Sequence, residues 1–143
     1  MAERLILDTN VLIELMRGGL PASIFGDSEL AIAAITVGEL VAGLSDGSKN
    51  AKPNLERKLL QIILKSADCL NYTAKTAEFH GRLLAQTRKA GRPRGYADLI
   101  IAAHAIETGR TLVSLDKAAR FSELPGVNAV DLSYFDPNPC STM

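Results

Sequence analysis

The sequence lacks an excess of charge of either sign, a cysteine framework and any long apolar run. Lysine plus arginine and aspartate plus glutamate number 16 each, so no overall basic field indicates a nucleic-acid partner. Its two cysteines, Cys69 and Cys140, lie far apart, which excludes a disulfide framework or a paired-cysteine metal site. The longest apolar stretch, residues 99–106, is much shorter than the ~20 residues that cross a bilayer. Because the N-terminus also lacks a signal-peptide layout, we expect a cytoplasmic protein that does not contact a membrane.

What the sequence does contain is typical of one globular domain. It has 143 residues, of which 47% are hydrophobic and 22% charged, and this composition excludes intrinsic disorder. Short apolar runs alternate with segments of helical spacing, which predicts parallel β-α-β units. We expect a three-layer α/β/α domain over residues 1–132, with a central parallel sheet of four or five strands, and a loosely held tail over 133–143. The predicted strands are 4–7, 30–35, 69–70, 111–115 and 127–132, and the predicted helices are 11–16, 36–44, 55–64, 73–90 and 97–108.

Two aspartates follow predicted strands directly. Asp8 comes after the first strand and Asp116 after the fourth. Open α/β sheets bind ligands outside the carboxyl ends of their strands, at the point where the strand order reverses. If the first and fourth strands flank that point, the two carboxylates meet in one crevice. The alternative interpretation is that each aspartate only forms a turn or caps a helix.

Two further acids belong to the same prediction. Asp98 begins a helix that is apolar on nearly every face, so its carboxylate is costly to bury, although the helix N-terminus offsets ~0.3–1 kcal/mol of that cost. Glu39 follows the second predicted strand, at the same edge of the sheet as Asp8. It also fits a capping box with Thr36, in which its carboxylate only reaches back to the start of its own helix.

Four carboxylates at one edge need a compensating charge. Two of them 4 Å apart repel by about 4 kcal/mol at an effective dielectric constant of 20. Such a cluster persists by taking up protons or by binding a cation, and all-oxygen ligands suit Mg²⁺ or Mn²⁺. These ions activate water and offset charge during displacement at phosphorus. The acids therefore predict a Mg²⁺ or Mn²⁺ site for phosphoryl chemistry.

Four segments in order resemble the successive motifs of PIN domains, and more narrowly those of VapC-type toxins. They are Leu-Asp-Thr-Asn-Val-Leu-Ile at 7–13, Thr-Val-Gly-Glu-Leu at 36–40, Ala-Asp-Leu-Ile-Ile-Ala-Ala at 97–103 and Leu-Val-Ser-Leu-Asp at 112–116. The resemblance runs from about residue 5 to residue 132. It matches Asp8, Glu39, Asp98 and Asp116, here called the acidic quartet, to the catalytic acids of the family. Asn10 and Ser114 match polar positions that support them.

The resemblance implies a function. VapC-type toxins are the ribonuclease half of a bacterial toxin–antitoxin pair, so we expect a Mg²⁺- or Mn²⁺-dependent endoribonuclease. Asp8, Asp98 and Asp116 would bind the metal directly or through water, and Glu39 would orient the attacking water. The expected products carry a 5′-phosphate and a 3′-hydroxyl. The expected partners are the RNA substrate, a small VapB-like antitoxin, a second copy in a homodimer and, only through the antitoxin, operator DNA.

Residues 88–95 form the densest basic stretch and lead directly into the helix that carries Asp98. One interpretation is a phosphate-binding surface that holds RNA over the acidic site. The other is a solvated helix end whose charges complement the helix dipole. The candidate RNA-binding residues, here called the basic rim, are Arg88, Lys89, Arg92 and Arg94.

Other functions fit the sequence less well. A haloacid-dehalogenase-like phosphatase needs Asp-x-Asp after the first strand, whereas this chain has Asp8-Thr9-Asn10. A receiver module needs paired acids there and a late lysine, and neither is evident. A PIN module that only binds, within a complex on DNA, remains an alternative. His80 and His104 lack metal-ligand spacing, and His104 is expected to be a packed core histidine.

Overall fold

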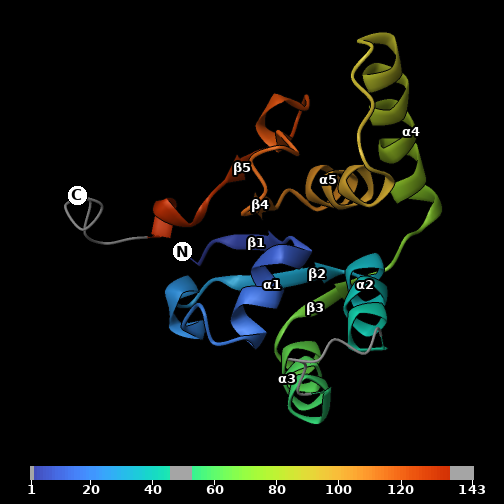
Figure 1. Ribbon diagram of the computed structural model, residues 1–143. Coiled ribbons are helices and arrows are strands. Elements are labelled where there is room, and N and C mark those ends of the chain that lie inside the picture. Colours follow the sequence, from blue (N-terminus) through green and yellow to red (C-terminus); the bar gives the residue numbers. More distant parts are fainter. Residues whose placement is uncertain (1, 46–52, 136–143) are drawn as a thin grey trace.

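The computed structural model describes residues 2–45 and 53–135, and its centre is a parallel β-sheet of five strands (Figure 1). The strand order is β3-β2-β1-β4-β5, and every pair of neighbours is parallel. The order therefore reverses between β1 and β4, as the positions of Asp8 and Asp116 require. The strands are β1 (Arg4–Leu7), β2 (Glu29–Ala33), β3 (Asp68–Leu70), β4 (Thr111–Val113) and β5 (Ala129–Val130).

Helices cover both faces of the sheet, which confirms the three-layer prediction. Alternate residues of β1 point to opposite faces, so Leu5 and Leu7 join one hydrophobic core while Ile6 joins the other. The first core packs under α1, α2 and α3, and the second under α4 and α5. The helices are α1 (Thr9–Met16), α2 (Ala34–Ser45), α3 (Pro53–Ser66), α4 (Ala74–Lys89) and α5 (Tyr96–Thr108), with short 3-10 helices η1 (Ala22–Phe25), η2 (Phe121–Glu123) and η3 (Leu132–Phe135).

The helix α5 places one acid of the quartet. It lies between the sheet and α4, and every residue from Leu99 to Ala105 is buried (Figure 1). Because α5 leads back into β4, its C-terminus is at the amino edge of the sheet and its N-terminus is at the carboxyl edge. Asp98, in the first turn, therefore lies at the edge where β1 and β4 end. No helix in the described ranges is long and apolar enough to cross a membrane.

Several boundaries differ from the sequence prediction, and three of these differences concern the site or the tail. The helix α2 begins at Ala34, so Thr36 is inside its first turn and does not open it. The strand β4 ends at Val113, which leaves Asp116 three residues beyond the strand. Residues 133–135 of the predicted tail belong to η3, where Phe135 packs edge-on against Phe25 with ring centroids 5.2 Å apart. This apolar contact joins that part of the predicted tail to the domain, and residues 136–143 lie outside the described ranges.

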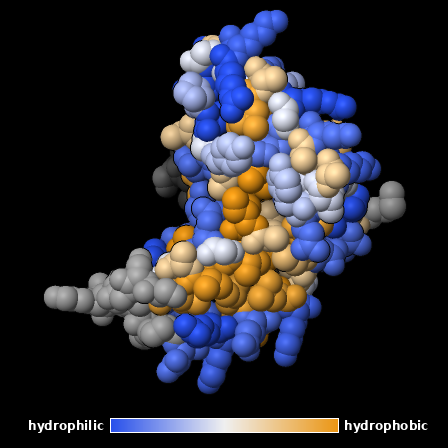
Figure 2. Space-filling view, turned by 90° about the vertical axis from the view of Figure 1, so that its right-hand side faces the viewer, coloured by the Kyte–Doolittle hydropathy of each residue, from blue (hydrophilic) through white to orange (hydrophobic). Residues whose placement is uncertain are grey.

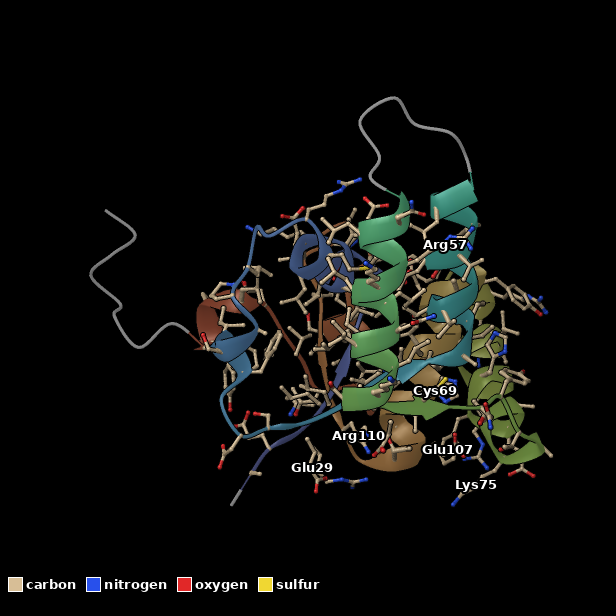
Figure 3. All side chains as sticks on the ribbon, turned by 90° about the horizontal axis from the view of Figure 1, so that it is seen from below. Glu29, Arg57, Cys69, Lys75, Glu107 and Arg110 are labelled. Carbon is tan, nitrogen blue, oxygen red and sulfur yellow. The ribbon has the colours of Figure 1, made fainter. Side chains whose placement is uncertain are left out.

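The opposite, amino edge of the sheet has charged groups with structural partners. Seen from below, Glu29, Arg110 and Glu107 lie along this edge (Figure 3). The Arg110 guanidinium is buried, donates to the Leu5 carbonyl at 3.3 Å and pairs with Asp68 at 3.4 Å. These charges hold strand ends together, which leaves the carboxyl edge as the candidate site.

Substitution of two glycines by alanine tests the backbone conformation of two helices of this fold. Gly109 ends α5 with φ +65°, a conformation that costs an L-residue ~1–2 kcal/mol, so Gly109→Ala is expected to lower the free energy of unfolding by about 1 kcal/mol. Gly81 lies inside α4 with open space at its Cβ position, so Gly81→Ala should raise it by roughly 0.5–1 kcal/mol. Urea unfolding measures both. Changes in the free energy of unfolding that were equal in size and sign for the two variants would contradict the left-handed conformation of Gly109 at the end of α5.

Candidate active site

Asp8 is a buried carboxylate at the junction of β1 and α1. Its side chain is 4% exposed, and its backbone is extended, as the residue before a helix requires. Oδ1 accepts a hydrogen bond from the Thr9 backbone N–H at 2.8 Å, which caps α1. The interpretation of Asp8 as a helix cap is therefore correct, but it accounts for only one of the two carboxylate oxygens.

The second oxygen of Asp8 connects the ends of β1 and β4. Oδ2 accepts from the Ser114 hydroxyl at 2.7 Å and from the Asn10 amide at 3.3 Å. Ser114 Oγ accepts from the Asp116 N–H at 3.0 Å, and Asn10 Oδ1 accepts from the Leu115 N–H at 3.1 Å. Asn10 and Ser114 thus fix the two strand ends relative to each other. The geometry also explains an amide at position 10, because a carboxylate there could not donate to Asp8.

Glu39 approaches the site from α2, through a residue that the sequence analysis did not single out. The Thr9 hydroxyl donates to Glu39 Oε1 at 2.8 Å and lies 3.2 Å from the Thr36 hydroxyl. Because Thr36 is inside α2, it is not the cap of that helix, and the capping-box interpretation of Glu39 is wrong. The only signal for Thr9 in the sequence is its place next to Asp8.

Asp98 and Asp116 are the other two acids of the quartet at the carboxyl edge of the sheet. The Asp98 carboxylate folds back over the start of α5, where a Cβ atom on Gly95 would lie only 3.2 Å from Asp98 Oδ2. Asp116 is exposed and closes a tight turn, accepting from the Ala118 N–H at 2.9 Å and the Ala119 N–H at 3.2 Å. Each carboxylate is therefore held by a local structure of its own.

The electrostatics show that the quartet has converged. Burial raises the pKa of Asp8, against the lowering effect of its bonds from Ser114 and Thr9, and the charges of Glu39 and Asp116 raise it further. Burial also raises the pKa of Asp98, with added contributions from the other three acids. Four residues, from two helices, the end of β1 and a loop, thus repel one another at one edge. Removing that repulsion requires a proton or a cation.

The donor set fits a hydrated divalent cation. Within residues 2–45 and 53–135, no three acid, histidine or cysteine side chains stand close enough to form a ready-made metal cage. Mg²⁺ keeps several waters and usually takes one or two protein carboxylates directly, so a looser group of oxygens suits it. The buried carboxylate of Asp8 and the half-buried carboxylate of Asp98 supply the charge that such an ion would neutralise.

The structure separates Arg94 from the other three residues of the basic rim. Arg94 is 11% exposed, and its guanidinium donates to the carbonyls of Ala119 and Arg120 and pairs with Glu123 at 3.4 Å. It therefore clamps the loop after Asp116 and is unavailable to an RNA phosphate. Its charge also counteracts the raised pKa of Asp98. The other members, Arg88, Lys89 and Arg92, are exposed.

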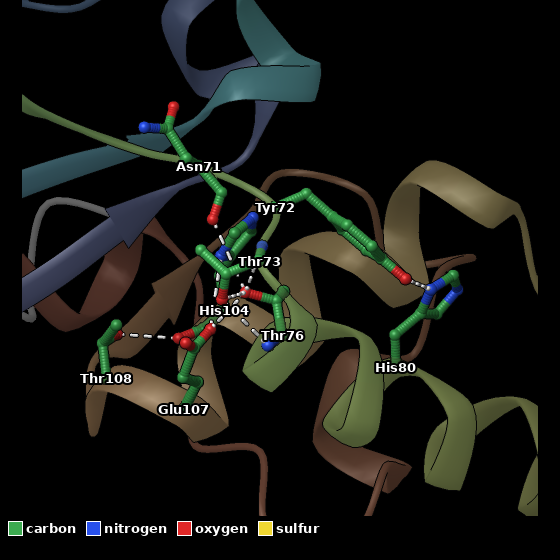
Figure 4. A network of polar contacts seen from close by, with 8 residues as sticks. All are labelled: Asn71, Tyr72, Thr73, Thr76, His80, His104, Glu107 and Thr108. Atoms are coloured by element: carbon green, nitrogen blue, oxygen red, sulfur yellow. Dashed lines mark hydrogen bonds and ion pairs between the residues drawn. The ribbon is translucent and has the colours of Figure 1, made fainter.

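The two histidines come from neighbouring helices, His80 from α4 and His104 from α5 (Figure 4). His104 is 1% exposed, and its Nδ1 lies 3.8 Å from Glu107, whose carboxylate accepts from the Thr76 hydroxyl at 2.7 Å. The His80 Nδ1 lies 2.9 Å from the Tyr72 hydroxyl. Burial lowers the pKa of both rings. The sequence favours a packed, hydrogen-bonded core histidine at position 104: the packing is confirmed, but the buried Nε2 of His104 has no hydrogen-bond partner among the described residues.

Comparison with known proteins finds one family over most of the chain. The model of the PIN domain matches residues 5–127. The tRNA(fMet)-specific endonuclease VapC of Shigella flexneri is 27% identical over 135 residues, which cover 91% of this chain and 98% of that protein. Ribonuclease VapC2 of Rickettsia felis is 30% identical over 129 residues, covering 85% of this chain and 92% of that protein.

Solved structures give the same result. The VapBC2 complex of Rickettsia felis, bound to a promoter DNA fragment, contains a chain with a TM-score of 0.76 and 26% identity, and the match covers 90% of this chain and 98% of that one. DNA-bound VapBC of Salmonella typhimurium has the same TM-score and identity, with 92% and 99% coverage. These neighbours are toxin–antitoxin complexes.

The raised pKa of Asp8 predicts how stability depends on pH in the absence of metal. The folded protein binds this proton more tightly than the unfolded chain, so the stabilisation is complete below the ordinary value of 3.8 and is lost as the pH rises through the folded pKa. The melting temperature of the wild type should therefore fall more between pH ~4 and pH ~7 than that of Asp8→Asn, which keeps a good helix cap.

Calorimetry in EDTA measures this difference, with the exposed Asp27→Asn as the matched control, whose pH profile should follow the wild type. At neutral pH, Asp8→Asn should be at least as stable as the wild type. A large loss of stability in that variant would instead mean that the Asp8 carboxylate has only a structural role, in the turn after β1.

Proposed function

Because this chain belongs to the PIN domain family and is similar to VapC ribonucleases over most of its length, we propose that it is a toxin ribonuclease that hydrolyses RNA at the acidic quartet with Mg²⁺ or Mn²⁺. One observation carries the assignment of the site. The charges of Glu39 and Asp116 raise the pKa of Asp8, and the charges of the other three acids raise the pKa of Asp98, at the carboxyl edge where the strand order reverses. Clustered pKa shifts of this kind are typical of functional sites.

Each acid has a role that its environment supports. Asp8 is buried and fixed by Ser114, Asn10 and its own helix, so it is the best-oriented metal ligand. Asp98 and Asp116 face the same space from α5 and from the loop after β4, and hold the metal directly or through its waters. Glu39, exposed and held by Thr9, orients the attacking water.

The bound metal supplies Lewis-acid activation of water and neutralises charge on the phosphate. The oxygen of the water attacks phosphorus, the bond from phosphorus to the 3′-oxygen breaks, and that oxygen takes up a proton. The products then carry a 5′-phosphate and a 3′-hydroxyl. Asn10 and Ser114 act by holding Asp8 and Asp116 in register, so both are positioning residues.

The proposed partners are a VapB-like antitoxin and a second copy of the chain. The apolar residues Leu12 and Met16 of α1 are buried in the core, so neither is available for contact with an antitoxin. Apolar residues gather instead in the middle and lower part of the face shown in Figure 2. The exposed large apolar side chains of α2 and α3 are Val41, Leu55, Ile62 and Leu64.

The antitoxin also has a chemical route to inhibition. An arginine inserted among the quartet would neutralise the same charge as Mg²⁺, and its planar guanidinium bonds two carboxylate oxygens at once. Inhibition would then weaken as the metal concentration rises. DNA would be bound only through the antitoxin.

A direct test combines stability with cleavage. Millimolar Mg²⁺ or Mn²⁺ should raise the melting temperature of the wild type, because an ion that binds only the folded state stabilises it. Asp8→Asn should reduce that shift and abolish cleavage of total RNA, and EDTA should abolish cleavage by the wild type. The matched control is Glu78→Gln, an exposed acid of α4, which should behave as the wild type in both assays.

Full cleavage by Asp8→Asn would contradict the assigned site. A wild type that binds metal and antitoxin but cuts no RNA would favour the module that only binds.

The exposed basic rim gives a separate prediction for RNA affinity. Arg88→Ala combined with Arg92→Ala should weaken RNA binding similarly for all sequences and reduce the slope of log affinity against log salt by about 0.7 per lost phosphate contact. Anisotropy titrations at several salt concentrations measure the slope. Lys65→Ala with Lys75→Ala removes the same charge elsewhere and is the control. An unchanged slope would favour the other interpretation, in which the exposed residues of the basic rim are only a solvated helix end.

A further inference from the structure

A cavity of about 290 Å³ opens beside the acidic quartet, on the β5 side of Asp116. Its floor is formed by the carboxyl ends of β4 and β5, and its walls by the loop that follows Asp116. Glu39 approaches the quartet from the opposite side, because α2 follows β2 and the strand order is β2-β1-β4-β5. The cavity therefore extends the site in one direction along the carboxyl edge. Its volume is at the lower limit of ligand pockets, which suits one small ligand.

The lining of the cavity combines cations with an apolar wall. Lys117 and Arg120 supply two positive charges beside Asp116 and Asp131, while the half-buried Ala129 and Val130 supply apolar surface. The cations already face acids: Lys117 contributes to the lowered pKa of Asp131, after the larger effect of Ser133, and Arg120 lies 3.7 Å from Glu123. These pairs are solvent-exposed, and such pairs contribute only ~0–1 kcal/mol each, so exchange for a phosphate costs little.

The backbone at Arg120 is held in an unusual conformation. Among the described residues it is the non-glycine residue with positive φ, at +46°. An L-residue adopts this conformation at a cost, and such residues gather at functional sites. Arg94 stabilises it by donating to the Arg120 carbonyl at 2.9 Å and to the carbonyl of Ala119. These two hydrogen bonds from Arg94 fix the direction in which the Arg120 side chain projects from the backbone, at the rim of the cavity.

These observations together define the ligand. Two cations next to a metal-binding edge recognise a phosphate, and an apolar wall next to them recognises the face of a base. A simple anion would leave the wall unused, and a neutral apolar ligand would leave the cations unused. Resting on the ribonuclease function proposed above, we propose that this cavity binds one nucleotide of the RNA beside the cleaved phosphate, with Lys117 and Arg120 on its own phosphate and the wall of Ala129 and Val130 against its base.

The experiment uses nucleoside 5′-monophosphates, which have no phosphodiester bond and therefore stay intact with Mg²⁺ present. The full chain is titrated with each of the four monophosphates and with inorganic phosphate, by calorimetry and by amide chemical shifts. The variant is Lys117→Gln with Arg120→Asn, since asparagine tolerates positive φ and the loop keeps its shape. Lys65→Ala with Lys75→Ala is the control for charge, and Arg120→Lys tests rescue by charge. Thermal melting checks that every variant is folded.

The wild type should bind at least one monophosphate more tightly than inorganic phosphate, and the shifts should include the amides of Ala129 and Val130. The double variant should raise Kd by about tenfold or more, the loss expected for a charge-assisted contact, while the control leaves it unchanged. In RNA cleavage the double variant should raise KM with little change in kcat, because neither residue touches the reacting atoms.

Equal affinity for inorganic phosphate and all monophosphates would overturn the nucleotide site, and so would a double variant that binds like the wild type. A wild type that binds the nucleotide here but cuts no RNA would contradict the ribonuclease and not the nucleotide site. A wild type that cuts RNA but fails the nucleotide test would contradict the cavity alone.

Discussion

The buried carboxylate of Asp8 links the two halves of the sheet. It accepts hydrogen bonds from the start of its own helix at Thr9, from Asn10 two residues on, and from Ser114 more than a hundred residues later. Burial of a charge this deep is tolerated only with such donors or with neutralisation. The same bonds set the separation of β1 and β4 at the carboxyl edge, so the register of the sheet and the geometry of the acids depend on one side chain.

The loop after β4 extends this constraint to the rest of the edge. Ser114 bonds both Asp8 and the Asp116 N–H, and Asp116 in turn holds the amides of Ala118 and Ala119. Arg94 reaches the same loop from the start of α5. Asp8, Asp116 and Glu39 are thus connected through the hydroxyls of Ser114 and Thr9 and through backbone amides, and not through bonds between carboxylates. That arrangement keeps four repelling charges in place without neutralising them.

The helix α5 is deeply buried and also carries an acid of the quartet, and these two properties usually conflict. It is the most buried of the described helices and contacts the sheet on one side and α4 on the other, so a polar residue along its length is costly to bury, and His104 is the one between Leu99 and Ala105. Its first turn is the exception, because free N–H groups and the helix dipole favour an acid there. Asp98 occupies that turn, and Gly95 leaves room for its carboxylate. The core of the protein therefore supports one member of the site directly.

The sequence by itself determined the alternation of strands and helices, the positions of Asp8, Asp98 and Asp116 next to element ends, and the family motifs, because these depend on periodicity and on neighbours within a few residues. It misplaced the start of α2 and the end of β4, since short apolar runs do not mark where a strand ends. Only the tertiary structure decided that Glu39 bonds Thr9 rather than its own helix, that Arg94 clamps Ala119 and Arg120, and that a cavity opens beside Asp116. Those contacts join residues 25 or more positions apart, and the strand order that brings them together follows from packing of the whole chain and not from any local pattern.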